Sequence, residues 1–296
     1  MIIESLQSVL SIIVRRHKVH IKIVVKLEKN MIENYEVLKS KVEEAELVLV
    51  GIGEEWEVKK DFFMENERYA EAVKVYGEDS LLLPYLQRAL INGEKSDKFK
   101  RIKENYDYLA KLLETKNYFV VSLCMDGLLE HSGWKQNRVV QPCGNLKKLQ
   151  CADACSVELY EVDEQWMKEV EAYLFEGKEI DITHMPVCPR CKGPLIFNNI
   201  LAENYVEEGY LDDWKIYTKW LQGTVNKKVC ILELGVGMRF PSVIRWPFEK
   251  ISYFNQKSSF FRVHSKLYQT AKEIQDRSYS IAALPDIFIQ ELSDGN

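Results

Sequence analysis

Four cysteines in two close pairs are the residues of this 296-residue chain whose types and spacing most clearly predict chemistry. The pairs are Cys151-Ala-Asp-Ala-Cys155 and Cys188-Pro-Arg-Cys191. Thiolates at these spacings can complete a tetrahedral structural zinc site. A disulfide pair and unrelated buried cysteines are the alternatives. We predict one structural zinc ion held by Cys151, Cys155, Cys188 and Cys191.

Composition and charge bound the class of protein that carries these cysteines. The chain is 46% hydrophobic and 29% charged, as ordinary globular proteins are. Its net charge of −5 argues against nucleic acid as a partner, since that affinity comes mainly from clustered Lys and Arg. No run approaches the roughly 18 apolar residues that span a bilayer, and the opening stretch lacks the features of a secretory signal. We expect a cytoplasmic protein with reduced thiols and no membrane span.

Apolar runs that stop at polar or glycine-containing turns predict the fold. Residues 45–50 run into Gly51-Ile52-Gly53, as a buried parallel strand runs into a tight turn. Further strands are predicted at 118–123, before Asp126-Gly127, at 228–234, before Gly235-Val236-Gly237, and at 250–255, which ends on Asn255. Strands that alternate with helical stretches indicate an α/β doubly wound, Rossmann-like parallel sheet with its site along the carboxyl edge.

The same patterns predict how the chain divides. A Rossmann-like domain takes residues 31–141 and 201–296, and its segment 57–116 is helical. A small zinc-binding domain takes residues 142–200, with an amphipathic helix at 162–175. Residues 1–30 are an N-terminal extension, either an upstream addition or a peripheral element of the fold, with a membrane-surface anchor as a further alternative.

The order of these landmarks resembles the sirtuin family of NAD-dependent protein deacylases, over residues 40–265. In that family a G-A-G-I-S turn opens the NAD site, T-Q-N-I-D-G-L follows a strand, and H-G precedes the first zinc cysteine. The segments that correspond here are Gly51-Ile52-Gly53-Glu54-Glu55, Ser122-Leu123-Cys124-Met125-Asp126-Gly127-Leu128 and Cys143-Gly144. The resemblance implies an NAD site between the two domains, a structural zinc, and an acylated or ADP-ribosylated protein as a partner.

The resemblance also implies which residues contact NAD or ADP-ribose. Asp126 either hydrogen-bonds the nicotinamide amide or orders its own turn, and the glycine turns are either binding or structural. The cofactor-binding residues expected on this basis are Gly51, Gly53, Phe63, Asp126, Gly235, Gly237 and Asn255.

The chain departs from the family where the chemistry takes place. The family's general base, a His, aligns with Cys143, and its Asn aligns with Cys124. A neutral thiol, with a pKa of about 8.5, is a poor proton relay, although a thiolate at Cys143 would suit ADP-ribosyl transfer as a nucleophile. The alternative is that Cys143 is a small packed residue or an additional thiol near the zinc site. Glu54 and Glu55 follow the first glycine turn, where a carboxylate opposes a phosphate.

Three functions therefore remain open. The first is an enzyme that cleaves the nicotinamide bond of NAD, for protein-lysine deacylation or ADP-ribosyl transfer, with Cys143 and Asp126 as candidate catalytic residues. The second is a catalytically degraded module that binds NAD or ADP-ribose. The third is a zinc-stapled interaction protein whose partner surface is the apolar segment 81–90.

Overall fold

The structure, a computed structural model, describes residues 33–93 and 97–294. The chain divides into two compact units, Met1–Glu44 and Ala45–Asn296. In the first unit residues 33–44 are described, and they are helical. The expectations for residues 1–30 lie outside the described residues. Across the described ranges, no helix has the length and apolar character that crossing a membrane requires.

The second unit is built on a six-stranded sheet in which every pair of neighbouring strands is parallel. The strands lie in the order β3-β2-β1-β7-β8-β9, which confirms the predicted Rossmann-like α/β fold. Chain order runs outward in opposite directions from β1 and β7, so the switch point of the topology lies between these two strands. The strands are β1 (Leu47–Ile52), β2 (Asn117–Ser122), β3 (Val139–Val140), β7 (Val229–Leu234), β8 (Ser259–Val263) and β9 (Ser278–Ile281).

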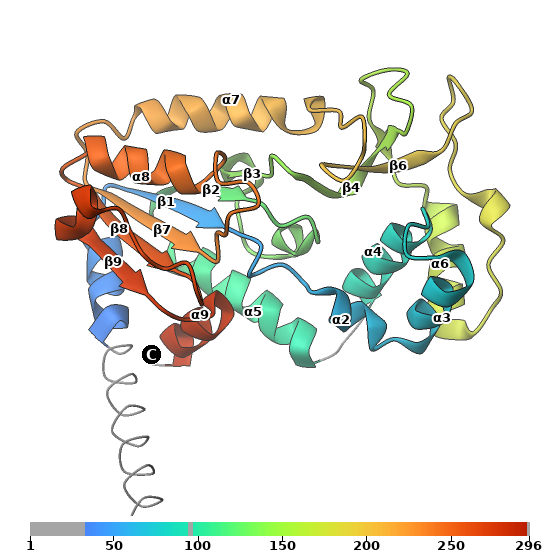
Figure 1. The fold of residues 1–296 in the computed structure, drawn as a ribbon, viewed down its shortest axis with the longest axis horizontal. Coiled ribbons are helices and arrows are strands. Elements are labelled where there is room, and N and C mark those ends of the chain that lie inside the picture. Colours follow the sequence, from blue (N-terminus) through green and yellow to red (C-terminus); the bar gives the residue numbers. More distant parts are fainter. Residues whose placement is uncertain (1–32, 94–96, 295–296) are drawn as a thin grey trace, which may run out of the picture. The chain divides into compact units, whose positions relative to one another are not determined.

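Helices cover both faces of this sheet (Figure 1). On one face lie α7 (Glu208–Gln222) and α8 (Arg245–Phe254), and on the other lie α5 (Asp97–Leu112) and α9 (Pro285–Asp294). Alternate strand residues such as Leu49 pack with Trp220 of α7 and Phe248 of α8 in one core cluster. Because both faces are covered, β1 and β7 are buried along their whole length.

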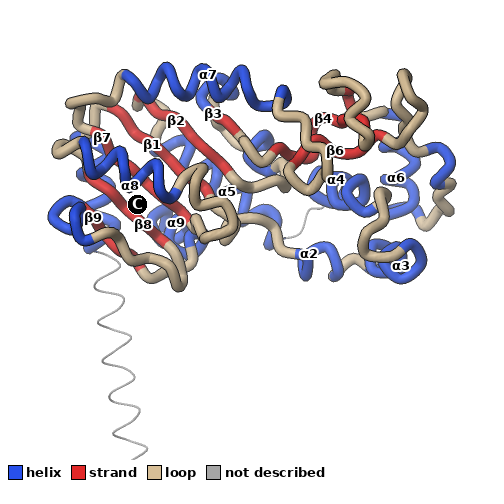
Figure 2. Tube along the Cα trace, turned by 45° about the horizontal axis from the view of Figure 1, so that its top comes forward, coloured by secondary structure: helices blue, strands red, loops and turns tan. Residues whose placement is uncertain are grey.

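A second, three-stranded antiparallel sheet carries the cysteine region (Figure 2). Its strands, in the order β5-β4-β6, are β4 (Gly144–Cys151), β5 (Tyr160–Glu161) and β6 (Leu195–Asn199). Helix α6 (Glu164–Glu176) lies between β5 and β6 in the sequence, close to the helix expected at 162–175. Asp163 caps it by accepting the N–H of Trp166 at 2.8 Å, and Gly177, at φ 70°, ends it.

The helical segment after the first turn packs against this smaller sheet as well as the larger one. It comprises α2 (Lys60–Met64), α3 (Glu67–Tyr76), α4 (Leu83–Gly93) and α5. In α4, Tyr85 packs edge-on against Trp166 of α6, with ring centroids 5.9 Å apart, and donates its hydroxyl to the carbonyl of Leu195 at 3.0 Å. Helix α4 is therefore joined to the cysteine region through a buried aromatic contact.

The strand predicted at 250–255 is wrong, because residues 250–254 form the last part of α8 and Asn255 is its C-cap. Helix α8 begins at Arg245, and its buried residues Arg245, Phe248 and Ser252 recur at helical spacing. The short apolar run 251–254 fits a strand and a helix equally well by periodicity. The strand that completes the sheet is β8, which follows the helix.

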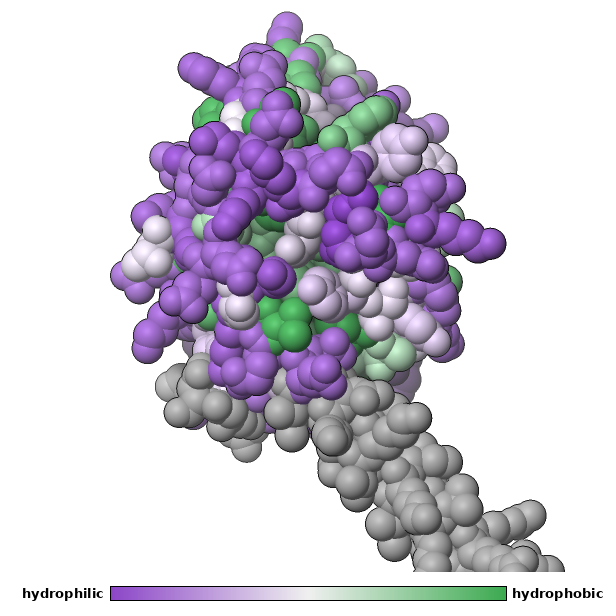
Figure 3. All heavy atoms as spheres, turned by 90° about the vertical axis from the view of Figure 1, so that its left-hand side faces the viewer, coloured by the Kyte–Doolittle hydropathy of each residue, from purple (hydrophilic) through white to green (hydrophobic). Residues whose placement is uncertain are grey.

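The amino ends of the strands lie at the left in Figure 1, and Figure 3 looks onto that side. Hydrophilic side chains cover most of the coloured surface there, with hydrophobic side chains in small patches between them. The carboxyl ends of the strands point the other way, towards the smaller sheet and α2 to α4 (Figure 1).

Candidate functional site

Glycines allow the turns after β1 and β7 to touch at the switch point. The backbone N–H of Gly53 donates to the carbonyl of Leu234 at 2.8 Å, and a Cβ on Gly53 would lie 2.3 Å from Cα of Val236. Gly235 has a φ of 64°, in the region that favours glycine. Gly51 is close-packed too, since a Cβ there would lie 2.6 Å from the side chain of Ile244. These glycines have a packing role that is independent of any ligand.

Glu55 joins the turn after β1 to the turn after β8. Its carboxylate accepts the backbone N–H of Ser265 at 3.0 Å and also accepts the hydroxyl of Ser265. Its own N–H donates to the carbonyl of Gly235 at 3.1 Å. We call the pair Glu55 and Ser265 the carboxylate clasp. It occupies hydrogen-bond donors at the sheet edge where a Rossmann-like fold offers donors to a nucleotide.

His264 stands next to the clasp as a neutral imidazole. Its Nδ1 accepts the backbone N–H groups of Lys266 and Leu267, both at 3.1 Å, so this nitrogen carries no proton. Burial lowers the pKa of the ring, which also favours its neutral form. The 3.2 Å approach of Nδ1 to Oε2 of Glu55 would be an ion pair only with a protonated ring, which burial of the ring disfavours by lowering its pKa.

Glu54 places a second carboxylate at the same edge. Its Oε1 accepts the N–H of Arg239 at 3.3 Å, and a Cβ on Gly237 would lie 2.6 Å from this oxygen. Its Oε2 is buried and has no hydrogen-bond partner among the described residues. An unsatisfied buried polar atom costs roughly 1–3 kcal/mol, and more when it is charged. The switch point thus contains two carboxylates where a pyrophosphate would need donors.

A buried charge network holds the turns after β7 and β8 in place. Arg262 of β8 donates from Nε and Nη2 to the carboxylate of Glu233 on β7, at 2.6 and 3.0 Å. Arg245 of α8 donates to the carbonyls of Val236 and Leu267, at 2.8 and 2.7 Å. The network fixes the backbone after β7 and after β8. This network was not predicted from the sequence; the signals that could have found it are an acid, Glu233, inside the apolar run 229–234 and an arginine, Arg262, inside 259–263.

Asp126 lies in the turn after β2, as predicted, and is buried. Its two carboxylate oxygens accept the N–H groups of Val58 and Leu128, each at 3.0 Å. Burial raises its pKa to about 6. Nearby, Glu57 accepts the N–H of Met125 at 2.9 Å, and burial raises the pKa of Glu57 too. The turns after β1 and β2 are therefore held together by carboxylates.

Asp126 and Phe63, which the sequence assigns to one site, line the same cavity. Its volume is about 650 Å³, and it lies among α2, α3, α4 and the segments that follow β2 and β6. Met125 and Leu146 of β4 also contribute to its wall. Gly51, Gly53, Gly235 and Gly237 lie outside this wall, at the switch point beside it.

Cys143 and Cys124 are both buried, and neither is placed as a thiolate. Burial raises the pKa of Cys143 to about 12 and that of Cys124 well above its usual value. The thiol of Cys124 donates to the carbonyl of Gly53 at 3.4 Å. Both are neutral at pH 7, which disfavours the nucleophile interpretation of Cys143. Gln141, which the sequence did not single out, donates to the carbonyl of Cys124 at 3.1 Å.

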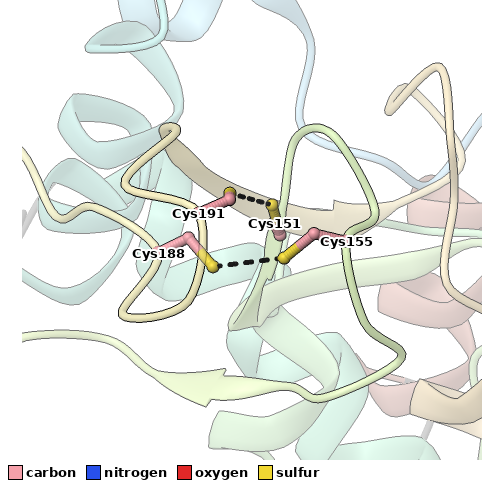
Figure 4. Close-up of side chains that lie close together, drawn as sticks. All are labelled: Cys151, Cys155, Cys188 and Cys191. Atoms are coloured by element: carbon pink, nitrogen blue, oxygen red, sulfur yellow. Dashed lines mark hydrogen bonds between the residues drawn. The ribbon is translucent and has the colours of Figure 1, made fainter.

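The four predicted cysteines converge (Figure 4). Their sulfur atoms all lie within 4.8 Å of one another, with Cys151 to Cys191 at 3.4 Å and Cys155 to Cys188 at 3.5 Å. None of them is disulfide-bonded. Four sulfurs around a tetrahedral zinc, each about 2.3 Å from the ion, stand about 3.8 Å apart. The cluster therefore has the donor type and the size that a structural zinc ion requires.

Asn255 does not lie with the other predicted residues. It ends α8, and its side-chain amide donates to the carbonyls of Thr224 and Lys227, at 3.1 and 3.0 Å. These carbonyls precede β7, so Asn255 lies at the amino edge of the sheet, opposite the switch point. The strand that placed it beside a nucleotide does not exist. The residues that do follow the neighbouring strand are His264 and Ser265.

The fold and these turns define a Rossmann-like α/β protein with a four-cysteine subdomain. Among curated proteins, the chain is 24% identical to a "Protein ADP-ribosyltransferase" from Staphylococcus aureus over 259 residues, which cover 82% of each protein. It is 26% identical to a "Probable bifunctional ADP-ribose hydrolase/ADP-ribosyltransferase" from Fusarium oxysporum f. sp. cubense over 137 residues. That match covers 45% of this chain and 23% of the fungal protein. No family model matches the chain.

Among solved structures, the comparison finds sirtuins. The structure described as "Sir2-p53 peptide-NAD+" has a TM-score of 0.49 and 16% identity, over 86% of this chain and 95% of that one. A mutant Sir2 homologue in complex with ADP-ribose has a TM-score of 0.49 and 14% identity, over 88% of this chain and 97% of that one. These solved structures are of the family that the sequence resembles.

Proposed function

We propose that this protein binds NAD or ADP-ribose at the carboxyl edge of its large sheet and transfers ADP-ribose to a protein rather than removing acyl groups from lysine. The observation that carries the proposal is the placement of Asp126 in the wall of a 650 Å³ cavity beside the switch point. The curated relative that matches 82% of the chain bears the name of a protein ADP-ribosyltransferase, which supports the same reaction.

The residues that would hold NAD divide between two places. The cavity, with Asp126 and Phe63, would take the nicotinamide end, and the turns with Gly53 and Gly235 would take the rest. NAD supplies an ADP-ribosyl group with nicotinamide as its leaving group. The chain itself must bind and orient NAD, exclude water from the site, and accept one proton from the acceptor. Glu57, a carboxylate whose pKa burial raises, has the chemistry for that last task.

The buried thiols favour transfer over deacylation. Deacylation in the sirtuin manner needs a base that relays a proton from a ribose hydroxyl. Cys143, with a pKa raised to about 12, does not ionise near neutral pH and has no second site to pass a proton on. Transfer to an external acceptor does not need this relay.

A second candidate is a nucleotide-binding module without turnover. It is favoured by one specific observation, the presence of the carboxylates of Glu54 and Glu55 among the donors of the switch point. Like charge opposes a pyrophosphate there, so the chain would bind a nucleotide weakly or hold it differently.

We further propose that the cysteine cluster holds one structural zinc ion and that the protein is cytoplasmic. The four cysteines of the cluster are not joined by disulfides, which agrees with a reducing compartment. The cluster joins the end of β4 to the loop before β6, so the metal would staple the smaller sheet.

One experiment separates the candidates. The purified protein is titrated with NAD in a calorimeter, and nicotinamide release is measured with an acetyl-lysine peptide, with a protein extract as acceptor, and with neither. Binding with release that needs the extract supports the transferase, and binding without release supports the module. Release that needs the acetyl peptide contradicts the preference for transfer. Absence of binding contradicts both. Asp126→Asn should weaken binding, and Asp212→Asn, an exposed carboxylate on α7, serves as the matched control.

A further inference from the structure

The cavity beside Asp126 combines apolar walls with carboxylates. Its apolar wall comes from Phe63 of α2, Val73 of α3, Leu83 of α4 and Leu201 after β6. Such a wall suits the methylene stem of a long side chain. The volume of about 650 Å³ exceeds what a single small ring fills, so a second group fits beside a nicotinamide.

The charge of the lining is negative. Four of its residues are acids, namely Glu57, Glu78, Asp79 and Asp126, and the one basic residue among the lining residues is Lys60. Lys60 already pairs with Glu78 at 2.8 Å. This pairing leaves three carboxylates of the wall without a salt bridge among the described residues.

Two of those three carboxylates are largely desolvated. Asp126 is 7% exposed and accepts only backbone N–H groups, and the carboxylate of Glu57 is held by the N–H of Met125. Arg239 and Lys59 act on Glu57 from beyond salt-bridge distance. Buried carboxylates are ordinarily paired with a cation, because water no longer stabilises their charge. This cavity supplies no such cation of its own.

We propose that the cavity binds a cationic side chain, lysine or arginine, of a protein acceptor. The stem would lie along the apolar wall, and the charged end would meet Glu57, Asp79 or Asp126. This inference rests on the proposed function, because it names the acceptor class for the same site. It differs from an acylated lysine, whose end is neutral, and from an acidic acceptor, whose charge the wall would repel.

The test uses the full chain and five labelled peptides of identical Gly-Ser sequence, each with one central residue: arginine, citrulline, lysine, acetyl-lysine or glutamate. Binding is measured by fluorescence anisotropy with saturating NAD and without it. Citrulline has the shape of arginine without its charge, so this pair isolates the charge. We expect the arginine peptide to bind roughly tenfold more tightly than the citrulline peptide, and the lysine peptide more tightly than acetyl-lysine.

Variants locate the effect. Glu57→Gln keeps an oxygen for the N–H of Met125, and Asp79→Asn changes an exposed residue, so both should fold, as circular dichroism would check. Each should reduce the preference for arginine over citrulline several-fold. Asp61→Asn, which removes an equal charge from α2 outside the cavity lining, should leave it unchanged.

The outcomes separate this inference from the proposed function. Equal binding of arginine and citrulline peptides, or tighter binding of the glutamate or acetyl-lysine peptide, overturns the inference. If NAD still binds in the same samples, the proposed function stands without it. If the arginine preference is present but NAD does not bind, the inference on the cavity is supported and the nucleotide proposal fails.

Discussion

The carboxylate of Glu55 holds both the backbone N–H and the hydroxyl of Ser265, a residue 210 positions away in the sequence. Through this clasp the turn after β1 and the turn after β8 become one surface. A dinucleotide that lies across the carboxyl edge must share this surface with the carboxylate or displace it.

Removal of that charge should strengthen nucleotide binding. Glu55→Gln keeps an oxygen for the N–H of Ser265 but carries no charge, so we expect roughly tenfold tighter binding of ADP-ribose by calorimetry. Glu208→Gln, an exposed change on α7, is the control and should have no effect. Weaker binding by Glu55→Gln would show that the clasp helps to hold the ligand, and unchanged binding would show that its charge does not oppose the ligand.

Asp126 should make stability depend on pH with a definite sign. Its folded pKa of about 6 lies above its ordinary value of 3.8, so the folded state binds more protons than the unfolded state between these values. Stability from this residue is therefore present below pH 4 and is lost as the pH rises to 6, by an amount on the order of 3 kcal/mol.

Urea unfolding of the wild type and of Asp126→Asn, at intervals from pH 4 to 7.5, would measure this pH-dependent contribution of Asp126 to stability. Between pH 4 and about pH 6 the wild type should lose unfolding free energy relative to Asp126→Asn. Above about pH 6 the difference between the two proteins should stay constant. A shift in favour of the wild type would mean that Asp126 is stabilised as a carboxylate.

Cys143 should be dispensable for chemistry. Because it is neutral and 2% exposed, Cys143→Ala should retain nicotinamide release within about tenfold of the wild type. Native protein at pH 7.5 should also resist alkylation at Cys143, as peptide mass spectrometry would show. Complete loss of release together with rapid alkylation would restore the nucleophile hypothesis.

Loss of the metal should unfold the smaller sheet. We expect one zinc per chain by elemental analysis, and a fall in melting temperature of roughly 10 °C or more with a chelator or in Cys188→Ser. Cys230→Ala, on β7 and outside the cluster, should keep the metal. A metal-free protein with the same melting temperature would contradict the site.

Glu233 should be the most costly residue to neutralise. Glu233→Gln removes the carboxylate that accepts from Nε and Nη2 of Arg262, which is 1% exposed, and leaves Glu249 as its one acidic partner, so we expect a loss of about 3 kcal/mol in unfolding free energy. Asp212→Asn breaks an exposed pair with Lys215 and should change little. A small effect of Glu233→Gln would show that Glu249, which already accepts from Nη1 of Arg262 at 2.7 Å, is a sufficient partner.

Strands β1, β2 and β7 were predictable because each is an apolar run, interrupted in β7 by Glu233 alone, that stops at a glycine or Asp-Gly turn. Strand β8 was not, since Arg262 interrupts its pattern. That arginine is buried among acceptors that are distant in sequence, chiefly Glu233, 29 residues earlier, and Glu249. Local periodicity carries no information on such a partner, and it also left residues 250–255 undecided between strand and helix.

The candidate site likewise divides into features that local sequence predicts and features that depend on segments distant in sequence. Cysteine spacing predicts the cluster because a metal ion demands a fixed number of sulfur donors near in sequence. The burial that keeps Cys143 neutral and the bond from Glu55 to Ser265 depend on segments that meet only in three dimensions. The sequence correctly indicated that Glu54 and Glu55 place carboxylates at the first glycine turn. It did not indicate their partners, Arg239 and Ser265.

Strand β4 has one end at Gly144, next to Cys143, and the other at Cys151 in the cysteine cluster, while Leu146 between them lines the cavity. One short strand, β4, therefore connects the cysteine cluster directly to the wall of the cavity. If the four sulfurs hold a zinc ion as we propose, its loss would displace this cavity wall, and binding of the proposed nucleotide would then depend on the metal.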